Sequence, residues 1–336
     1  MGRKEIYVAN PNRYDEGVMN YRRCGESGIK MPEISLGFWW NFGGINVYEE
    51  SLAKVTYAFD HGITCFDLAN NYGPPYGSAE ETFGRIYEEN FKQHRHEMII
   101  TTKAGYDMWE GPYGNWGSKK YLIASINQSL KRLNLEYVDI FYHHRMDPET
   151  PLEETIEALT RIVKSGKALY AGLSNYDGAN LEKASKLFYL ANVPFIINQN
   201  RYSIFDRTIE NNGLKLKSKK LGKGIIAYSP LAQGLLTDKY LNGIPDDSRM
   251  AADGRYLKRD AITRKKLEQI KALNDLALKR GESLAQMALR WVLKDEEITS
   301  VLIGASKPSQ IIENLKIINK MDLTDEEIRI IDDITL

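Results

Sequence analysis

The sequence has little cysteine, little histidine and no excess of charge of either sign. Two cysteines, Cys24 and Cys65, in 336 residues are too few for a disulfide framework or a four-thiolate zinc site. Lys plus Arg and Asp plus Glu each number 45, so the formal net charge is zero. Such a chain has no overall field that would attract nucleic acid or a membrane surface, although a local basic pocket is compatible with it.

Long apolar segments are also absent. No run approaches the roughly 20 apolar residues that cross a bilayer, and residues 1–17 lack the apolar stretch of a signal peptide. We therefore expect a cytoplasmic protein with no membrane partner. At about 150 residues per domain the length allows two domains, but α/β barrels of this size are routinely one. We expect a single domain over 1–336, with 1–19 as an N-terminal extension.

Short apolar runs recur along the chain in the pattern of buried strands. Most are continuous and do not alternate, which is typical of strands covered on both faces of a parallel sheet. These runs occupy residues 33–37, 64–69, 98–104, 138–144, 168–174, 195–200, 224–229 and 300–306. Helical patterns separate them or precede the last of them, at 48–62, 78–91, 118–133, 150–167, 180–192, 206–222, 260–280 and 282–294.

Eight strands with helices between them predict an α/β fold, a (β/α)8 TIM barrel. The alternative is a doubly wound open sheet, which is disfavoured because no G-x-G-x-x-G motif follows the first strand. Two further segments stand apart from the repeat. Residues 21–34 predict a small hairpin that could close the barrel floor. Residues 231–256 form a long loop before the last strand, and such loops are usually functional or disordered.

Four polar side chains come at the ends of predicted strands. Asp67 and Tyr72 follow the second apolar run, Lys103 ends the third and His144 ends the fourth. The carboxyl ends of parallel strands meet at one mouth of a barrel, where barrel enzymes have their sites. We therefore expect these four residues to converge. An acid, a phenol, an amine and an imidazole held together are suited to proton transfer.

Tyr72 alone would be interpreted as a surface aromatic in the loop NNYGPPYG. Lys103 changes that interpretation, because a lysine at the end of an apolar strand is costly unless it is paired. Asp67 is the obvious counter-ion. A free tyrosine has a pKa of about 10, and a neighbouring ammonium is expected to bring the pKa of Tyr72 closer to neutral pH. The three residues would then form a tuned general acid.

The adjacent pair His143 and His144 raises the question of a metal site. Adjacent residues of a strand point to opposite faces, so the two imidazoles cannot easily share one ion. With five histidines and no H-E-x-x-H motif, we expect no metal. One imidazole facing the mouth could instead hydrogen-bond a substrate carbonyl, while the other packs outside.

A second set of residues is suited to a dinucleotide. The segment 172–175 (GLSN) and Gln199 end strands with amides and hydroxyls that can bind a carboxamide edge. Tyr228 could stack on a flat ring, although core packing is the commoner role. Gly304 and Ser306 lead toward an amphipathic helix whose first N–H groups suit a phosphate, with Lys307 adding charge. The alternative for this last segment is an ordinary capped surface helix.

Taken in order, these segments resemble the aldo-keto reductase family. The resemblance rests on GITCFDLANNYG, SAEETFG, TTKAG, YHHR, GLSNY, QNRYSIF, AYSPLAQGLLTDKY and VLIGAS, and it runs from about residue 20 to 334. Four segments are most similar to the branch of bacterial L-glyceraldehyde 3-phosphate reductases: LGFWWNFGG, KAGYDMWEGPYG, LEYVDIFYHHR and LNGIPDDSRM. The β subunits of voltage-gated potassium channels are more distant. The resemblance implies a metal-free (β/α)8 barrel that binds NADPH in extended form.

Carried over by position, the resemblance implies a catalytic tetrad in which Tyr72 is the proton donor, and it selects His144 over His143. The tetrad is Asp67, Tyr72, Lys103 and His144. The implied cofactor residues are Trp39, Ser174, Asn175, Gln199, Tyr228, Ser229, Leu231, Gln233, Gly234, Lys239, Arg249, Gly304, Ser306, Gln310, Glu313 and Asn314. The implied substrate pocket is Trp39, Trp40, Tyr72, Trp109 and His144. Lys307 would suit a 2′-phosphate, so NADPH is preferred to NADH.

The implied activity is hydride transfer to a small aldehyde, L-glyceraldehyde 3-phosphate or methylglyoxal, and a homo-oligomer is possible. Aromatic residues in two loops are expected to wall the pocket: Trp39, Trp40, Tyr106, Trp109, Tyr113 and Trp116. A substrate phosphate would also need a cation, and the sequence leaves Arg145 and Arg207 both open. The alternative function is a redox-sensing subunit with little turnover. The channel subunits carry Asn at the position of His144, so the histidine favours an enzyme.

Overall fold

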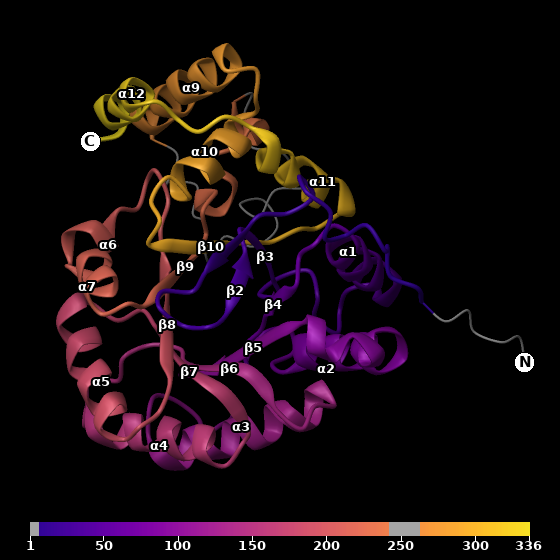
Figure 1. The fold of residues 1–336 in the computed structure, drawn as a ribbon, viewed down its shortest axis with the longest axis vertical. Coiled ribbons are helices and arrows are strands. Elements are labelled where there is room, and N and C mark those ends of the chain that lie inside the picture. The colour runs from indigo at the N-terminus through magenta and orange to yellow at the C-terminus, as the bar shows by residue number, and fades with distance from the viewer. Residues whose placement is uncertain (1–6, 242–262) are drawn as a thin grey trace, which may run out of the picture.

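The computed structural model describes residues 7–241 and 263–336, and over these residues the main feature is a closed barrel of eight parallel strands. The strands follow one another round the barrel in chain order, and the last pairs with both its predecessor and the first (Figure 1). The predicted (β/α)8 barrel is confirmed. The strands are β3 (Ile34–Gly37), β4 (Cys65–Asp67), β5 (Ile99–Ala104), β6 (Val138–His143), β7 (Ala168–Ser174), β8 (Phe195–Arg201), β9 (Gly224–Tyr228) and β10 (Ile298–Ile303).

Helices surround the barrel (Figure 1). Those that link successive strands from β3 to β9 are α1 (Tyr48–Asp60), α2 (Ser78–Ile86), α3 (Lys119–Leu133), α4 (Leu152–Lys164), α5 (Gly178–Leu190), α6 (Thr208–Asn211) and α7 (Leu214–Lys220). The others are α9 (Arg264–Lys279), α10 (Leu284–Val292), α11 (Pro308–Leu315) and α12 (Asp325–Thr335). The prediction of one helix over 206–222 is wrong, because Gly213 takes a left-handed φ of 78° between α6 and α7.

A two-stranded antiparallel hairpin, β1 (Tyr21–Arg23) with β2 (Lys30–Pro32), closes the N-terminal end of the barrel. The backbone N–H of Glu26 donates to the carbonyl oxygen of Gly222, just before β9, at 2.9 Å. Cys24 and Met31 are fully buried in the cluster that fills the barrel interior. The expected floor is confirmed, and β2 lies across the centre of the ring of strands in Figure 1.

Side chains alternate between the barrel interior and the helix layer along each strand. On β4, Cys65 belongs to the interior cluster, whereas Phe66 belongs to the cluster beneath the helices. Lys103 on β5 is in register with Tyr142 on β6, and its Nζ lies 5.9 Å from the centroid of that interior ring. The same alternation turns Asp67 inward at the last position of β4. Strand periodicity therefore delivers the acid and the amine to the inside of one barrel mouth.

The segment after β9 contains the first part of the predicted long loop. Residues 231–241 include two short 3₁₀ turns, Ala232–Gly234 and Asp238–Tyr240. The rest of the loop, with the predicted cofactor residue Arg249, lies outside the described residues. Among the helices that the structure describes, none is long and apolar enough to cross a membrane.

Candidate active site

A buried ion pair joins the ends of β4 and β5. Lys103 Nζ lies 2.5 Å from Asp67 Oδ2 and donates a second hydrogen bond to the Leu68 carbonyl oxygen at 2.6 Å. The exposed fractions of the two side chains are 0% for Lys103 and 3% for Asp67. Two charges this far from water require such partners, since a buried charge without them is strongly destabilising. The pairing expected from the strand ends is present.

Tyr72 lies beside this pair, and its ring is close to both other members of the predicted group. Lys103 Nζ lies 5.0 Å from the Tyr72 ring centroid, and the His144 ring meets the Tyr72 ring edge-on with centroids 5.9 Å apart. The Tyr72 carbonyl oxygen accepts backbone hydrogen bonds from Gly77 and Ala79 at 3.1 and 3.2 Å. The turn that carries Tyr72 is thereby tied to the start of α2. The four residues predicted from the ends of three strands thus lie together.

The electrostatics of Tyr72 differ from the expectation. Burial raises the pKa of the Tyr72 phenol well above its usual value, and the Asp67 carboxylate raises it further. Burial also lowers the pKa of Lys103, while Asp67 opposes that shift. The predicted lowering of the Tyr72 pKa is therefore wrong: Asp67 balances the ammonium, and in the described chain Lys103 donates to Asp67 and Leu68 instead of to the phenol. The phenol stays protonated at neutral pH.

The two adjacent histidines point in opposite directions, as predicted. The His144 ring lies at the mouth between Tyr72 and Tyr106, whose ring centroid is 4.6 Å away. His143 turns toward the helix layer, where its Nδ1 lies 2.7 Å from the Tyr176 hydroxyl. Burial lowers the pKa of His144 well below its usual value, with the Lys103 charge adding to the shift. Burial also lowers the pKa of His143 to about 4, so both imidazoles are neutral at neutral pH.

Asp67 is held by two further side chains. Thr101 Oγ1 donates to Asp67 Oδ1 at 2.7 Å, and Gln199 Nε2 donates to the same oxygen at 2.9 Å. From the sequence, Gln199 is expected to bind the cofactor, and Thr101 is not predicted to belong to the site. The strand period does indicate Thr101, because it lies two residues before Lys103 and therefore points to the same inward face. Gln199 therefore connects Asp67 at the end of β4 to β8.

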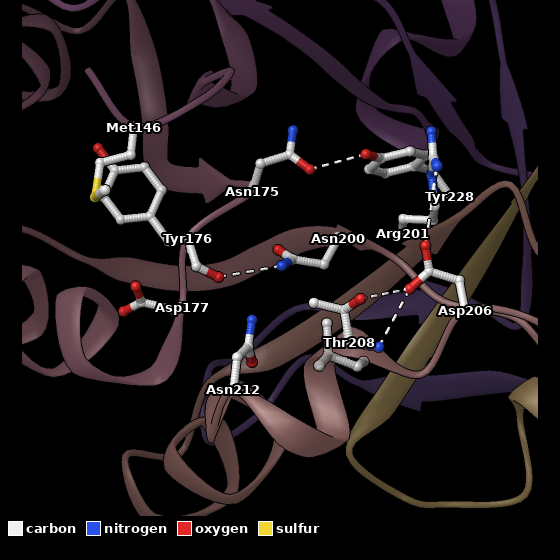
Figure 2. Close-up of a pocket in the computed structure, with 11 residues that line it drawn as sticks. Met146, Asn175, Tyr176, Asp177, Asn200, Arg201, Asp206, Thr208, Asn212 and Tyr228 are labelled. Carbon is white, nitrogen blue, oxygen red and sulfur yellow. Dashed lines mark hydrogen bonds and ion pairs between the residues drawn. The ribbon is translucent and has the colours of Figure 1, made fainter. Parts of the chain in front are cut away.

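The residues predicted to hold a nicotinamide lie at the carboxyl ends of β7, β8 and β9. Asn175 has a left-handed φ of 58°, and its Nδ2 donates to the His144 carbonyl oxygen at 3.0 Å and to Ser174 Oγ at 3.2 Å. Its Oδ1 accepts from the Tyr228 hydroxyl at 2.8 Å (Figure 2). Asn175 and Tyr228 also line a polar cavity of about 340 Å³ beside Arg201. An amide and a ring thus lie directly next to His144.

The segment that follows β9 turns sharply through several left-handed residues. Ser229, Gln233 and Gly234 have φ values of 54°, 59° and 97°. The Gln233 Oε1 atom is buried and has no hydrogen-bond partner among the described residues. Leu231 packs against the hydrophobic core, and Lys239 lies within the second 3₁₀ turn. An unusual backbone with an unsatisfied acceptor is typical of a segment that a ligand completes.

The predicted phosphate-binding end lies between β10 and α11. A Cβ atom added to the exposed Gly304 would meet no atom within 4 Å, so the approach to this backbone is open in the described structure. Ser306 donates to Gln310 Oε1 from its backbone N at 2.7 Å and from its hydroxyl at 3.2 Å. Lys307, at the N-cap of α11, is exposed. The remaining candidates on this helix are half-buried or buried: Glu313 and Asn314.

The predicted aromatic wall is only partly assembled. Tyr106 meets His144, as described above. Trp109 packs against Tyr121 with ring centroids 5.0 Å apart, and Tyr113 is 57% exposed. Trp39 and Trp40 pair with each other after β3, with ring centroids 5.7 Å apart. No group of three or more His, Cys, Asp or Glu residues is placed to hold a metal in the ranges 7–241 and 263–336.

Comparison with known proteins agrees with this geometry. The model of the aldo/keto reductase family matches residues 33–335, which is most of the chain. The chain belongs to the aldo/keto reductase family. This aldo/keto reductase is 53% identical over 330 residues to a protein of Escherichia coli O157:H7 and 52% identical to one of Escherichia coli strain K12. Both relatives are named L-glyceraldehyde 3-phosphate reductase, and each match covers 97% of this chain and 95% of the relative. Membership of the family makes this aldo/keto reductase an oxidoreductase.

Proposed function

We propose that this protein reduces short aldehydes to alcohols with NADPH, and that Tyr72 donates the proton. The observation that carries the proposal is the position of the Tyr72 ring. It lies 5.0 Å from Nζ of the buried Lys103, which is paired with Asp67, and 5.9 Å from the His144 ring. Reduction of an aldehyde adds a hydride to carbon and a proton to oxygen. A phenol held between an ammonium and an imidazole is suited to supply that proton.

The proton leaves from a neutral phenol. The raised pKa of Tyr72 keeps the hydroxyl protonated at neutral pH. Once the proton has moved to the substrate oxygen, the Lys103 ammonium stabilises the phenolate that remains, because opposite charges at short range favour the ionised form. Asp67 holds that ammonium in place. Thr101 and Gln199 in turn hold Asp67 through its other oxygen.

His144 is assigned to orient the carbonyl group. Its lowered pKa keeps the ring uncharged, so it acts through a hydrogen bond to oxygen and does not compete with Tyr72 as the acid. The backbone N–H of His144 donates to the Ala104 carbonyl oxygen at 2.9 Å, and its own carbonyl oxygen accepts from Asn175. Tyr106 covers one edge of the ring. These contacts fix the imidazole on the side of the site next to Tyr72.

The residues present fit a nicotinamide dinucleotide. The Asn175 amide and the Tyr228 ring would hold the nicotinamide, and the unsatisfied buried Gln233 Oε1 and the left-handed backbone at Ser229 would follow the pyrophosphate. The open backbone at Gly304 and the exposed Lys307 would take the adenosine phosphate, and Lys307 is the reason to prefer NADPH to NADH. When bound, the cofactor supplies the hydride. The other residues proposed to contact it are Trp39, Ser174, Gln199, Leu231, Gly234, Lys239, Arg249, Ser306, Gln310, Glu313 and Asn314.

The proposed substrates are L-glyceraldehyde 3-phosphate and methylglyoxal. The first is supported by the names of the two relatives. The second is supported by the small aromatic surface beside His144, which offers a short aldehyde an apolar contact through Tyr106. The two aldehydes differ in charge, so their relative rates report whether the site recognises an anion.

The test is the oxidation of NADPH with each aldehyde, comparing wild type with Tyr72→Phe. Removal of the proton donor is expected to lower the rate constant kcat on the order of 100-fold or more while NADPH still binds. Tyr72→Phe retaining more than half of the wild-type kcat would contradict the role of Tyr72. Tight NADPH binding by wild type without turnover of either aldehyde would favour the redox-sensing alternative.

A further inference from the structure

Arg145 is a half-buried cation at the same mouth as the proposed catalytic group. Its guanidinium carbon lies 3.6 Å from the Trp116 ring centroid and 4.1 Å from the Tyr106 ring centroid. Its Nε donates to the Gly105 carbonyl oxygen at 2.9 Å, and its Nη2 donates to Asn115 Oδ1 at 3.0 Å. The guanidinium is therefore fixed in position by two rings and two hydrogen bonds, all from the loop between β5 and α3.

The charge of Arg145 has no carboxylate partner in the described chain. No Asp or Glu oxygen of residues 7–241 and 263–336 forms an ion pair with it within 4.0 Å. The acids in the neighbouring loops are used elsewhere. Asp147 accepts hydrogen bonds from the backbone N–H groups of Gly117, Glu149 and Thr150. Asp107 accepts a hydrogen bond from Asn115 Nδ2.

Donors also remain on the guanidinium. An arginine carries five N–H donors, and the described residues accept from Nε and Nη2 but not from Nη1. A rigid, partly desolvated guanidinium with free donors and no counter-ion matches what an arginine needs to bind a phosphate through two parallel hydrogen bonds.

The position of Arg145 suits a substrate that reaches from the catalytic group. Tyr106 contacts both groups: its ring centroid lies 4.6 Å from that of the His144 ring and 4.1 Å from the guanidinium carbon. In a three-carbon aldehyde phosphate, the phosphorus lies four bonds from the carbonyl carbon. At about 1.5 Å per bond that chain spans roughly 5 Å, which is comparable to these two distances.

Among the described residues, two other arginines near the carboxyl end of β8 are less suited. Arg207 pairs with Asp332 at 2.7 Å, donates to Thr335 and packs on Trp291, so it ties β8 to the C-terminal helix α12. Arg201 is 49% exposed and faces Asp206 at 3.9 Å, at the polar cavity shown in Figure 2. A loosely paired surface cation binds anions weakly, because water and the neighbouring carboxylate compete.

We propose that Arg145, stacked between Tyr106 and Trp116, binds the phosphate of a short aldehyde phosphate whose carbonyl lies at Tyr72 and His144. This inference rests on the proposed function and adds to it the residue that selects anionic substrates. Asn115 is a positioning residue, because it holds the guanidinium and also accepts the backbone N–H of Trp116 at 2.7 Å.

The first experiment compares Arg145→Met with wild type on a charged and an uncharged aldehyde. The methionine keeps an apolar side chain between the two rings. For L-glyceraldehyde 3-phosphate, kcat/KM is expected to fall on the order of 100-fold, mainly through KM, because a charge-assisted contact is lost. For methylglyoxal, kcat/KM should change less than about 3-fold, which also shows that the variant is folded. Equal losses on both aldehydes, or no loss on the phosphate, would overturn the proposal.

Arg201→Met is the matched control, since it removes a cation from the same rim without touching the stack. It should leave the preference for the phosphate unchanged, and loss of that preference in this variant would move the anion site to Arg201. Asn115→Ala is expected to raise KM for the phosphate several-fold with an unchanged kcat.

The second experiment does not need turnover. Glycerol 3-phosphate has no aldehyde, and its binding should change the fluorescence of Trp116, whose ring lies against the guanidinium. The change should vanish in Arg145→Met and in Trp116→Phe. If wild type reduces no aldehyde but this signal appears and depends on Arg145, then the proposed function fails while the anion site stands. No signal in wild type, even when NADPH is present, would mean that Arg145 binds no phosphate.

Discussion

The two halves of the barrel mouth are built differently. On the side of β4 and β5, the charged groups Lys103 and Asp67 are buried and paired with each other. On the side of β9, β10 and α11, candidate groups are exposed or unsatisfied, as in Gly304 and Gln233. The backbone N–H and the hydroxyl of Ser306 both donate to Gln310 Oε1.

The difference follows from what each side has to do. The proposed acid–base group must hold its geometry whether or not a substrate is present, and the described chain supplies hydrogen-bond donors to both oxygens of Asp67. The proposed cofactor side must exchange contacts with a ligand, and in the described chain the backbone at Gly304 is open and the buried Gln233 Oε1 has no hydrogen-bond partner. Substitutions on the first side should therefore change both stability and rate, and substitutions on the second should change cofactor affinity alone.

The largest expected effect is that of Lys103→Met. The change leaves the Asp67 carboxylate buried without its counter-ion, and breaking a buried pair in this way costs about 3–5 kcal/mol of unfolding free energy. Urea unfolding measures it. The double variant Asp67→Asn with Lys103→Met should recover much of the stability but no activity. A single variant within about 1 kcal/mol of wild type would mean that the pair is not held as described.

A smaller effect is expected from pH, through His143 at the end of β6. His143 has a folded pKa of about 4, below its unfolded value of about 6.5. Between these values the unfolded state binds more protons, so stability is lost as pH falls below about 6.5. From pH 7 to pH 5 the loss due to His143 should be about 2 kcal/mol. Thermal unfolding of His143→Gln should show a correspondingly smaller pH dependence.

The smallest effect is expected on the cofactor side, from Gln310→Ala. Gln310 is exposed, so the unfolding free energy should stay within about 0.5 kcal/mol of wild type. If Gln310 also contacts the cofactor, the dissociation constant for NADPH should rise about 2- to 10-fold, the value of one hydrogen bond. Titration of protein fluorescence with NADPH measures it, and Ser309→Ala on the same helix is the matched control. A loss of stability in Gln310→Ala without a change in affinity would reverse the contrast between the two sides.

Much of the architecture follows from local patterns in the chain. Continuous apolar runs with helices between them predict a parallel barrel, because strands buried on both faces need apolar side chains at every position. The same runs predict that Asp67, Lys103 and His144 meet, since every parallel strand ends at the same mouth. The turn between Gly25 and Gly28 also predicts the hairpin over 21–34. The helix predicted over 206–222 failed at Gly213, where a single left-handed residue outweighs the helical spacing around it.

Other features required the tertiary structure, because they depend on distances between segments far apart in the chain. Gln199 contacts Asp67 across 132 positions, a link that no local pattern contains. The pKa of Tyr72 was predicted in the wrong direction, because burial raises it and the nearby Asp67 carboxylate raises it further. Arg145 and Arg207 are the same residue type, and only their surroundings distinguish them. Arg207 pairs with Asp332, whereas Arg145 stacks on two rings and has no carboxylate partner among the described residues. Residue type and periodicity thus determine which groups reach the mouth, whereas burial and three-dimensional neighbours determine their charge, their partners and what they can bind.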